Sequence, residues 1–239
     1  MQGRIDLPPR LAAVAEYIPA GEGVVDIGTD HAYLPISVIS SGKCPWAVAA
    51  DVNIGPLESA KKHIEEKGLS QHISLRLSNG LDAFEAQELE CIVMAGMGGH
   101  LMADLVERAY AQGKLTQYHT MVLQPQSEIF RVRQTVHGCG GRIVQEKMVE
   151  DRGKRYTILQ VQPGQESYGA EEYEYGRKLF ECRDSVFFTV LTEEIQKNKH
   201  ILQGLMAQEV VSETTKGRIE EIQQKISRGE RMLAQWDAQ

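Results

Sequence analysis

The sequence predicts an α/β fold in which a doubly wound sheet ends in an antiparallel hairpin and is followed by a helical coiled-coil hairpin. Two observations carry this prediction. Short apolar runs alternate with amphipathic stretches from about residue 23 to residue 164, and heptad-like spacing replaces the alternation after Pro163 and Gly164. We therefore expect one domain over residues 1–164 and a helical domain over residues 165–239.

Five apolar runs are candidate parallel strands, because strands buried on both faces of a sheet are continuously apolar. They are residues 24–27, 47–50, 73–77, 91–94 and 121–123. The stretches between them have helical spacing, at residues 35–40, 56–67, 99–111 and 127–136. This alternation is typical of a Rossmann-like sheet. Two further runs, 143–149 and 156–161, are joined by a polar connection that contains Gly153, which indicates a β-hairpin; a plain loop is the alternative.

The last part of the chain predicts two long antiparallel helices. Apolar residues recur there at spacings of 3, 4, 7 and 3 in two sets: Phe188, Leu191, Ile195, Leu202 and Leu205, then Ile219, Ile222, Ile226, Leu233 and Trp236. The polar stretch 212–217 is the expected turn. A generic amphipathic bundle is the alternative.

Composition limits the functional classes. The chain has 239 residues and a formal net charge of -7, which argues against a nucleic-acid binder covered in cations but allows a local basic strip. Its four cysteines form no C-x-x-C pair and its histidines show no ligand spacing, so we expect no metal. No signal peptide and no apolar run of membrane length is present, so we expect a cytoplasmic protein with no membrane partner.

Polar residues and glycines follow the first two strands. Asp26 stands at the end of the first strand, and Gly28, Thr29, Asp30 and His31 form a tight turn between that strand and a helix, where open α/β sheets bind ligands. The turn lacks the G-x-G-x-x-G pattern, which argues against a dinucleotide. The second strand ends in Asp51 and Val52, and a carboxylate there suits ribose hydroxyls.

The third and fourth strands end in the same manner. Asn79 and Gly80 follow the third strand, where a plain Asn-Gly turn is an equal alternative. The fourth strand runs into Ala95, Gly96, Met97, Gly98 and Gly99. Four successive strand ends with this chemistry predict that S-adenosylmethionine (SAM) binds at the carboxyl edge of the sheet. The expected SAM contacts are Asp26, Gly28, Thr29, Asp30, His31, Asp51, Val52, Asn79, Gly80, Ala95, Gly96, Met97 and Gly98.

Several segments resemble the bacterial tRNA adenine-N1 methyltransferases that modify adenine 22. The resemblance covers the whole chain and is carried by residues 4–11, 26–31, 95–99 and 123–126. It implies the class I SAM methyltransferase fold and tRNA as the substrate. The family lacks the Asn/Asp-Pro-Pro-Tyr tetrad of amino-group methyltransferases, and residues 95–98 take its place here. This departure has chemical meaning, because N1 of adenine carries a lone pair and needs no acceptors to localise it.

The resemblance also suggests roles at the reaction site. Asp30, helped by His31, would stabilise the cation formed on adenine, although capping of the next helix is an equal alternative. The Gln124 amide oxygen would accept a hydrogen bond from adenine N6. A pocket for the base, entered after base flipping, would be bordered by Met97, Gly99, Gln124, Pro125 and Gln126.

A locally basic segment is the expected RNA contact, with a solvated charged face as the alternative. Its cations are Arg131, Arg133, Arg142, Lys147, Arg152, Lys154 and Arg155, joined by Arg4 and Arg10 from the N-terminus. The acidic C-terminal helices are expected to guide the tRNA body through the isolated cations Lys197, Lys199, Lys216 and Arg218, or to dimerise; a monomer is favoured. The rival functions are a SAM-dependent enzyme with another substrate, a catalytically silent RNA-binding protein and a nicotinamide oxidoreductase.

Overall fold

The structure is a computed structural model that describes residues 6–88, 90–115, 119–207 and 212–237. It divides into two compact units, Met1–Lys178 and Leu179–Gln239. The division falls later than the expected boundary after Gly164, because residues 165–178 pack on the sheet domain. Arg133 holds this segment by donating hydrogen bonds to the carbonyl oxygens of Tyr173 and Glu174, at 2.9 and 3.0 Å.

The first unit is built on a seven-stranded sheet with the order β3-β2-β1-β4-β5-β7-β6. Its strands are β1 (Val24–Ile27), β2 (Ala47–Asp51), β3 (Ile73–Leu77), β4 (Cys91–Met97), β5 (Thr120–Pro125), β6 (Gly141–Asp151) and β7 (Lys154–Pro163). β1 to β5 are mutually parallel, and β7 is antiparallel to β5 and β6. The predicted doubly wound sheet with a terminal antiparallel hairpin is confirmed.

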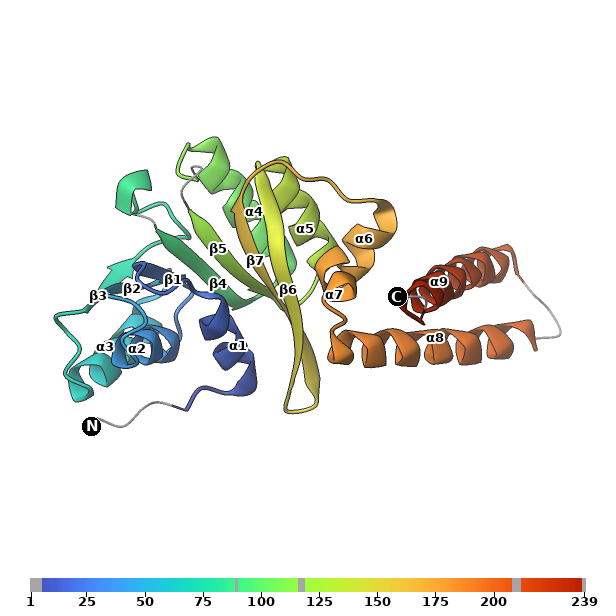
Figure 1. Cartoon of the computed structure of the whole chain (residues 1–239), viewed down its shortest axis with the longest axis horizontal. Helices are drawn as coiled ribbons and strands as arrows, with labels where there is room; N and C mark the ends of the chain where they lie inside the picture. The colour runs from blue at the N-terminus through green and yellow to red at the C-terminus, as the bar shows by residue number, and fades with distance from the viewer. Residues whose placement is uncertain (1–5, 89, 116–118, 208–211, 238–239) are drawn as a thin grey trace. The chain divides into compact units, whose positions relative to one another are not determined.

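Helices cover both faces of the sheet (Figure 1). They are α1 (Pro9–Tyr17), α2 (Tyr33–Ser40), α3 (Ile54–Glu66), α4 (Gly99–Ala111), α5 (Ile129–Gly138) and α6 (Ala170–Tyr175), with a short 3-10 turn at Ala86–Glu88. The short helix α7 (Arg177–Glu181) spans the boundary between the two units. Strand side chains alternate between two cores. Val24 packs with residues of α1, α2 and α3, whereas Val25 packs with residues of α4 and α5.

The hairpin of β6 and β7 continues past the carboxyl ends of the parallel strands (Figure 1). Leu123 near the end of β5 pairs with Leu159, while the hairpin turn lies further on, between Asp151 and Lys154. The predicted six-residue connection is therefore a tight turn at Arg152 and Gly153, whose φ angles are 50° and 73°. Two successive positive φ angles match the twist of a hairpin.

The second unit is a helical hairpin of α8 (Ser185–Met206) and α9 (Glu213–Asp237). Phe187 contacts Trp236, with ring centroids 6.0 Å apart, and Ile195 packs on Gly229, so the helices run antiparallel. The prediction of a turn at residues 212–217 is wrong for residues 213–217, because α9 begins at Glu213.

The predicted seam of the helical hairpin is correct in part. Five of its residues are buried: Leu191, Ile195, Ile222, Ile226 and Trp236. Phe187 and Met232 are buried where the heptad spacing favoured Phe188 and Leu233. Phe187, Leu191 and Ile195 follow one another at intervals of four, whereas a heptad seam alternates intervals of three and four. The coiled-coil geometry therefore stays a prediction.

Candidate active site

Asp26 is a buried carboxylate at the carboxyl edge of the sheet. Only 7% of its surface is exposed. Burial raises the pKa of Asp26 to about 6; the hydrogen bond with the Thr29 side chain and the charge of Arg10 oppose this rise, and the charge of Asp51 adds to it. Because a buried carboxylate is costly without a counter-charge, the site is suited to a cationic ligand group.

The turn after β1 is tied down and leaves one buried polar atom unsatisfied. The backbone amides of Gly28 and Thr29 both donate to the carbonyl oxygen of Ala50, at 2.8 and 3.0 Å. Gly28 has a φ of 79°, which side chains rarely adopt. His31 Nδ1 is buried and has no hydrogen-bond partner in the described part of the chain. Such an atom beside a glycine turn fits a ligand that would complete its hydrogen bond.

The end of β2 combines a carboxylate with apolar surface. Asp51 Oδ1 accepts a hydrogen bond from the amide of Asn53 at 2.7 Å, which fixes the carboxylate at the strand end. Val52 and Leu77 expose 59% and 55% of their surfaces at the ends of neighbouring strands. This arrangement is suited to ribose hydroxyls beside the face of a planar base.

The third strand end is packed more closely than the sequence indicated. The Asn79 carbonyl oxygen accepts a hydrogen bond from Arg108 Nη2 at 2.7 Å. A Cβ on Gly80 would lie 2.6 Å from Leu105 Cδ2. Packing against α4 therefore accounts for Gly80. The exposed side chain of Asn79 is the group at this strand end that a ligand can reach.

The glycine turn after β4 meets the turn after β1. Gly96 has a φ of 85°, and the register between β4 and β5 shifts between Ala95 and Met97, which is a bulge. Met97 Cε lies 3.3 Å from the point that a Cβ on Gly28 would occupy. The exposed Gly98 is the N-cap residue directly before α4, and it provides no side-chain cap. Since the strand order reverses between β1 and β4, these turns form the ligand crevice of the sheet.

Asp30 lies at the surface beside this crevice. Its carboxylate is 3.5 Å from His31 Nε2. The capping alternative is wrong, because the N-cap of α2 is Ala32, with a φ of 54°, and the helix has no side-chain cap. The rings of His31, Tyr33 and His63 have centroids 5.3 to 5.4 Å apart, which supports His31 next to Asp30.

Gln124 is the first predicted site residue that the structure corrects. Its exposed fraction is 0%. Gln124 Oε1 accepts a hydrogen bond from Arg10 Nη1 at 2.7 Å, and Nε2 donates to the carbonyl oxygen of Pro125 at 2.9 Å. The predicted contact with adenine N6 is therefore wrong, because the oxygen is occupied and the side chain is out of reach. Gln124 orients Arg10 instead.

The remaining residues of the predicted base pocket differ in access. A Cβ on Gly99 would lie 2.1 Å from the carbonyl oxygen of Ser127, so Gly99 is buried for loop packing and its predicted substrate contact is wrong. Pro125 is buried as well. Gln126 is exposed, and its backbone N–H donates a hydrogen bond to the carbonyl oxygen of Met97 at 2.9 Å. Met97 and Gln126 are thus the accessible pair.

The family model for tRNA (adenine(22)-N(1))-methyltransferases matches residues 24–231. A curated relative, the tRNA (adenine(22)-N(1))-methyltransferase of Bacillus subtilis, is 32% identical over 228 residues, which are 93% of this chain and 94% of that protein. This chain belongs to the tRNA (adenine(22)-N(1))-methyltransferase family.

Two solved structures of similar proteins carry ligands. A putative tRNA (m1A22) methyltransferase of Streptococcus pneumoniae in complex with S-adenosyl-L-methionine is 33% identical, with a TM-score of 0.81 over 94% of this chain and 98% of its own. The M. capricolum protein TrmK in complex with S-adenosylhomocysteine is 25% identical, with a TM-score of 0.78 over 96% of this chain and 97% of its own. The likeness extends over both units of this family member.

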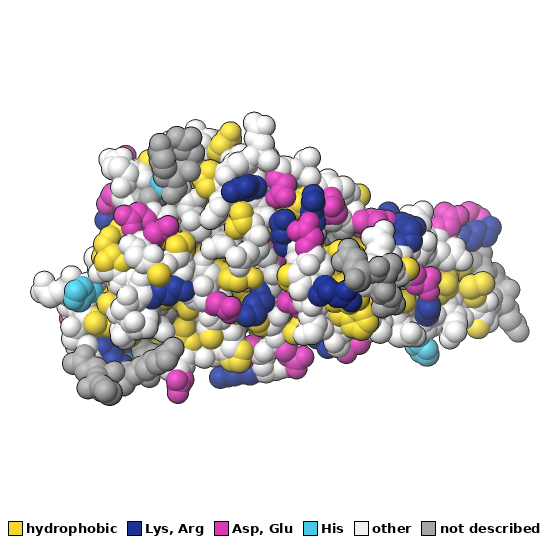
Figure 2. Space-filling model, in the orientation of Figure 1, with side chains coloured by type: hydrophobic (Ala, Val, Ile, Leu, Met, Phe, Trp, Pro, Cys, Tyr) yellow, Lys and Arg dark blue, Asp and Glu magenta, His cyan; other side chains and the backbone are white. Residues whose placement is uncertain are grey.

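The expected basic strip is dispersed in this family member. Arg133 is 1% exposed, and its guanidinium pairs with Glu146 at 2.7 Å. Its predicted RNA contact is therefore wrong. Arg131 is paired with Asp104 at 2.7 Å, and Arg4 lies outside the described residues. Figure 2 shows positive and negative side chains interspersed on the visible face.

Some of the predicted cations do reach the solvent. Three lie exposed at the hairpin tip: Arg152, Lys154 and Arg155. Three of the four cations expected to stand alone on the helical unit are paired instead: Lys199 with Glu230, Lys216 with Glu213 and Arg218 with Glu221, each at 2.7 Å. The tip is thus the most accessible part of the predicted RNA contact.

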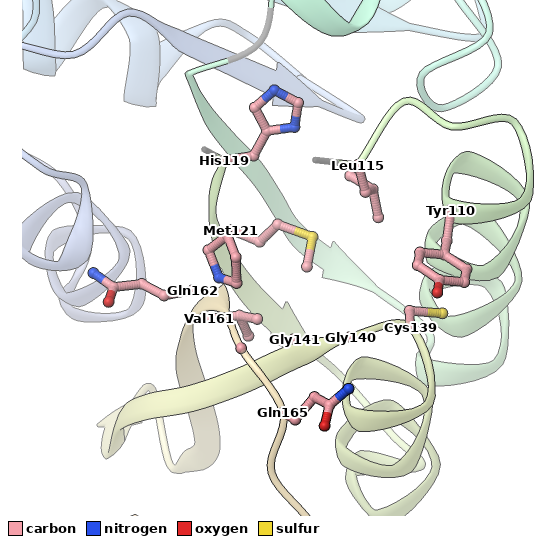
Figure 3. A pocket seen from close by; sticks show the side chains of 12 residues that line it. Tyr110, Leu115, His119, Met121, Cys139, Gly140, Gly141, Val161, Gln162 and Gln165 are labelled. Carbon is pink, nitrogen blue, oxygen red and sulfur yellow. The ribbon is translucent and has the colours of Figure 1, made fainter. Parts of the chain in front are cut away.

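A separate cavity of about 270 Å³ lies at the other edge of the sheet (Figure 3). Its lining includes Met121 at the start of β5, Gly141 at the start of β6 and Pro163 at the end of β7. These residues mark the amino ends of the parallel strands, so the cavity is distinct from the crevice at Asp26 and Gly28.

No three His, Cys, Asp or Glu side chains among the described residues are grouped as a metal site. No helix in that part of the chain combines the length and the apolar character needed to cross a bilayer. The four cysteines form no disulfide.

Proposed function

We propose that this protein transfers a methyl group from SAM to N1 of adenine 22 in tRNA. The observation that carries the proposal is the crevice at the strand-order reversal, where Asp26, Gly28 and Gly96 lie at one edge of a sheet shared with the family. The similar S. pneumoniae and M. capricolum structures, solved with SAM and its product, support SAM as the cofactor.

The residues of the crevice fit the parts of this cofactor. Asp26 would compensate its cationic methionine end, the open turn at Gly28 would admit it closely, and Asp51 would bind the ribose hydroxyls. Val52 and Leu77 would flank the adenine ring, with Asn79 at its edge. When bound, SAM supplies an electrophilic methyl group on a sulfonium centre.

The chain needs no general base for this reaction. N1 of adenine carries a lone pair in the ring plane, so the protein mainly has to orient the base and exclude water. N1 also lies on the pairing edge, so the base must leave its stack before it can react. Met97 and Gln126 are the accessible side chains that would border the flipped base.

Asp30 is suited to stabilise the product-like charge. Attack by N1 gives the adenine ring a positive charge, and a fixed carboxylate nearby lowers the energy of that state. The aromatic cluster behind His31 supports the Asp30–His31 pair, so little reorganisation is needed.

Exposed cations beyond the crevice would hold the RNA. The hairpin extends past the carboxyl edge of the sheet, and its tip carries Arg152, Lys154 and Arg155. Phosphate contacts of this kind orient the substrate without reading its sequence. We further propose that the protein acts as a cytoplasmic monomer; the unbridged cysteines support the compartment.

A single assay tests the proposed function. The protein is incubated with labelled SAM and unmodified bacterial tRNA, and the methylated nucleoside is identified and mapped by primer extension. We expect 1-methyladenosine at adenine 22 and no product from a tRNA that carries guanine there. A label on another nucleoside, on a protein or on a small molecule would support a SAM enzyme with a different substrate. No transfer at all would support the silent RNA-binding alternative.

A further inference from the structure

Arg10 is a partly buried cation that has no acidic partner among the described residues. Its described contacts are the hydrogen bond to Gln124 Oε1 at 2.7 Å and the ring of Tyr156, whose centroid lies 5.6 Å from Arg10 Cζ. By contrast, Arg131 and Arg133 each contact a carboxylate at 2.7 Å. Arg10 therefore leaves most of its five N–H donors unused.

The guanidinium of Arg10 is held in a fixed place. α1 begins at Pro9 after Pro8, and proline at the first helical position preorganises the turn that carries Arg10. The acceptor, Gln124, is itself fixed by its bond to Pro125. The ring of Tyr156 adds a cation–π contact. A cation that is held by two neutral groups and forms no ion pair with a carboxylate among the described residues is prepared for an anion that a ligand supplies.

The location of Arg10 ties it to the reaction. Its Nη1 lies 3.3 Å from the point that a Cβ on Gly96 would occupy, so the glycine leaves room for the guanidinium beside the β4 turn. Its charge also acts on Asp26, which lies at the end of β1. Arg10 therefore lies at the crevice, beside the ends of β1 and β4.

We propose that Arg10 binds an anionic oxygen group that a ligand carries into the crevice, with Gln124 and Tyr156 as positioning residues. The proposal rests on the proposed function. Two ligands of that reaction carry such a group, namely the carboxylate of the methionine end of SAM and a phosphate of the target nucleotide. A guanidinium binds either group through paired, charge-assisted hydrogen bonds.

The test compares Arg10→Ala and Arg10→Lys with Lys61→Ala, which removes an exposed cation of α3 that pairs with Glu65 at 3.9 Å. Calorimetry measures the affinity of each full-length variant for SAM and for 5′-methylthioadenosine, which lacks the amino-acid end. Filter binding measures the affinity for unmodified tRNA at several salt concentrations. Arg10→Lys keeps the charge but loses the paired geometry, and circular dichroism reports the fold of each variant.

The outcomes separate the two sources of the anion. If the carboxylate binds, Arg10→Ala weakens SAM about 10-fold to 100-fold and leaves 5′-methylthioadenosine unchanged. If the phosphate binds, SAM affinity is kept, while tRNA binding weakens and its salt slope falls by about one. In either case Arg10→Lys recovers only part of the loss. Affinities of Arg10→Ala that match those of Lys61→Ala for every ligand overturn the proposal while the proposed function stands. A wild-type protein that binds neither SAM nor tRNA overturns both.

Discussion

At the scale of single residues, the carboxylate of Asp26 makes ligand binding in the crevice depend on pH. Its pKa of about 6 comes from burial, so the unliganded site takes up a proton more readily than an exposed aspartate. A cationic ligand group next to it favours the ionised form. Proton release and ligand binding are therefore coupled.

This coupling predicts that SAM affinity depends on pH. Affinity should be highest above the pKa of about 6 and should fall as the pH drops below it, because the ligand must then displace a proton. The limiting slope is about tenfold per pH unit. Calorimetry in two buffers with different ionisation heats measures both the affinity and the released proton. Asp26→Asn should bind weakly with little pH dependence, and a flat profile for the wild type would contradict the role of Asp26.

Asp30 provides a second test at this scale. Asp30→Ala should lower methyl transfer about 10-fold to 100-fold, because a fixed charge near the developing adenine cation is lost. Single-turnover rates at saturating SAM measure the effect apart from any loss of cofactor binding, with Asp30→Asn as the variant that keeps the side-chain size without the charge. Full turnover in Asp30→Ala would rule out the electrostatic role.

Some of these residues could be predicted from the sequence and others could not. Asp26 interrupts the first apolar run near its end, and Gly28 and Asp51 directly follow apolar runs, so strand ends alone identified all three residues. Gln124 and Arg133 were misjudged, because a sequence shows that a side chain is polar and does not show which partner it meets. Arg10 was expected on a basic strip, and its bond to Gln124 spans 114 positions of the chain.

At the scale of elements, the hairpin of β6 and β7 is the part most directly open to RNA. Reversing its charges by Arg152→Glu, Lys154→Glu and Arg155→Glu should weaken tRNA binding and reduce the salt slope by about two to three. Filter binding over a salt series measures both, with Lys61→Glu as the control for net charge. SAM affinity should not change. An unaltered tRNA affinity would remove the tip from the proposed RNA contact.

The close contact between α8 and α9 depends on one glycine. A Cβ on Gly229 would lie 2.7 Å from Ile195 Cγ1, whereas nothing lies within 4 Å of a Cβ on Gly217 in the same helix. Gly229→Ala should lower the free energy of unfolding of the helical unit by about 1–3 kcal/mol through overpacking. Gly217→Ala should raise it by about 0.5–1 kcal/mol through helix propensity. Urea unfolding followed by circular dichroism compares them, and equal effects would refute the packing argument.

The elements show where periodicity is informative. All the strands were found, because a buried strand is a continuous apolar run. α1 was missed although Pro9 stands at its first position and Ala13, Val14 and Tyr17 form its buried face, since the segment is short and lies outside the alternation. Only the first seam position of α8 was placed one residue late, at Phe188 in place of Phe187, because a phenylalanine stands at each of the two positions.

At the scale of the whole molecule, the boundary between the units illustrates the same limit. The composition changes near Gly164, but the first unit extends to Lys178. The later boundary follows from a buried ion pair: Arg133 and Glu146 hold the chain after β7, and the amide of Lys178 donates to Glu146 Oε2 at 3.2 Å. The change in composition therefore marks the end of the last strand, whereas the contacts of residues 165–178 with the sheet determine where the first unit ends.

The most direct test of the account is a calorimetric titration of the intact protein with SAM, beside a Gly28→Val variant whose fold is verified by circular dichroism. Valine at a φ of 79° is strained and would fill the turn at the end of β1. We expect one SAM bound per wild-type chain and no measurable heat from the variant. Absence of binding by the wild type, or equal affinity in the variant, would contradict the claim that this edge of the sheet holds the methyl donor.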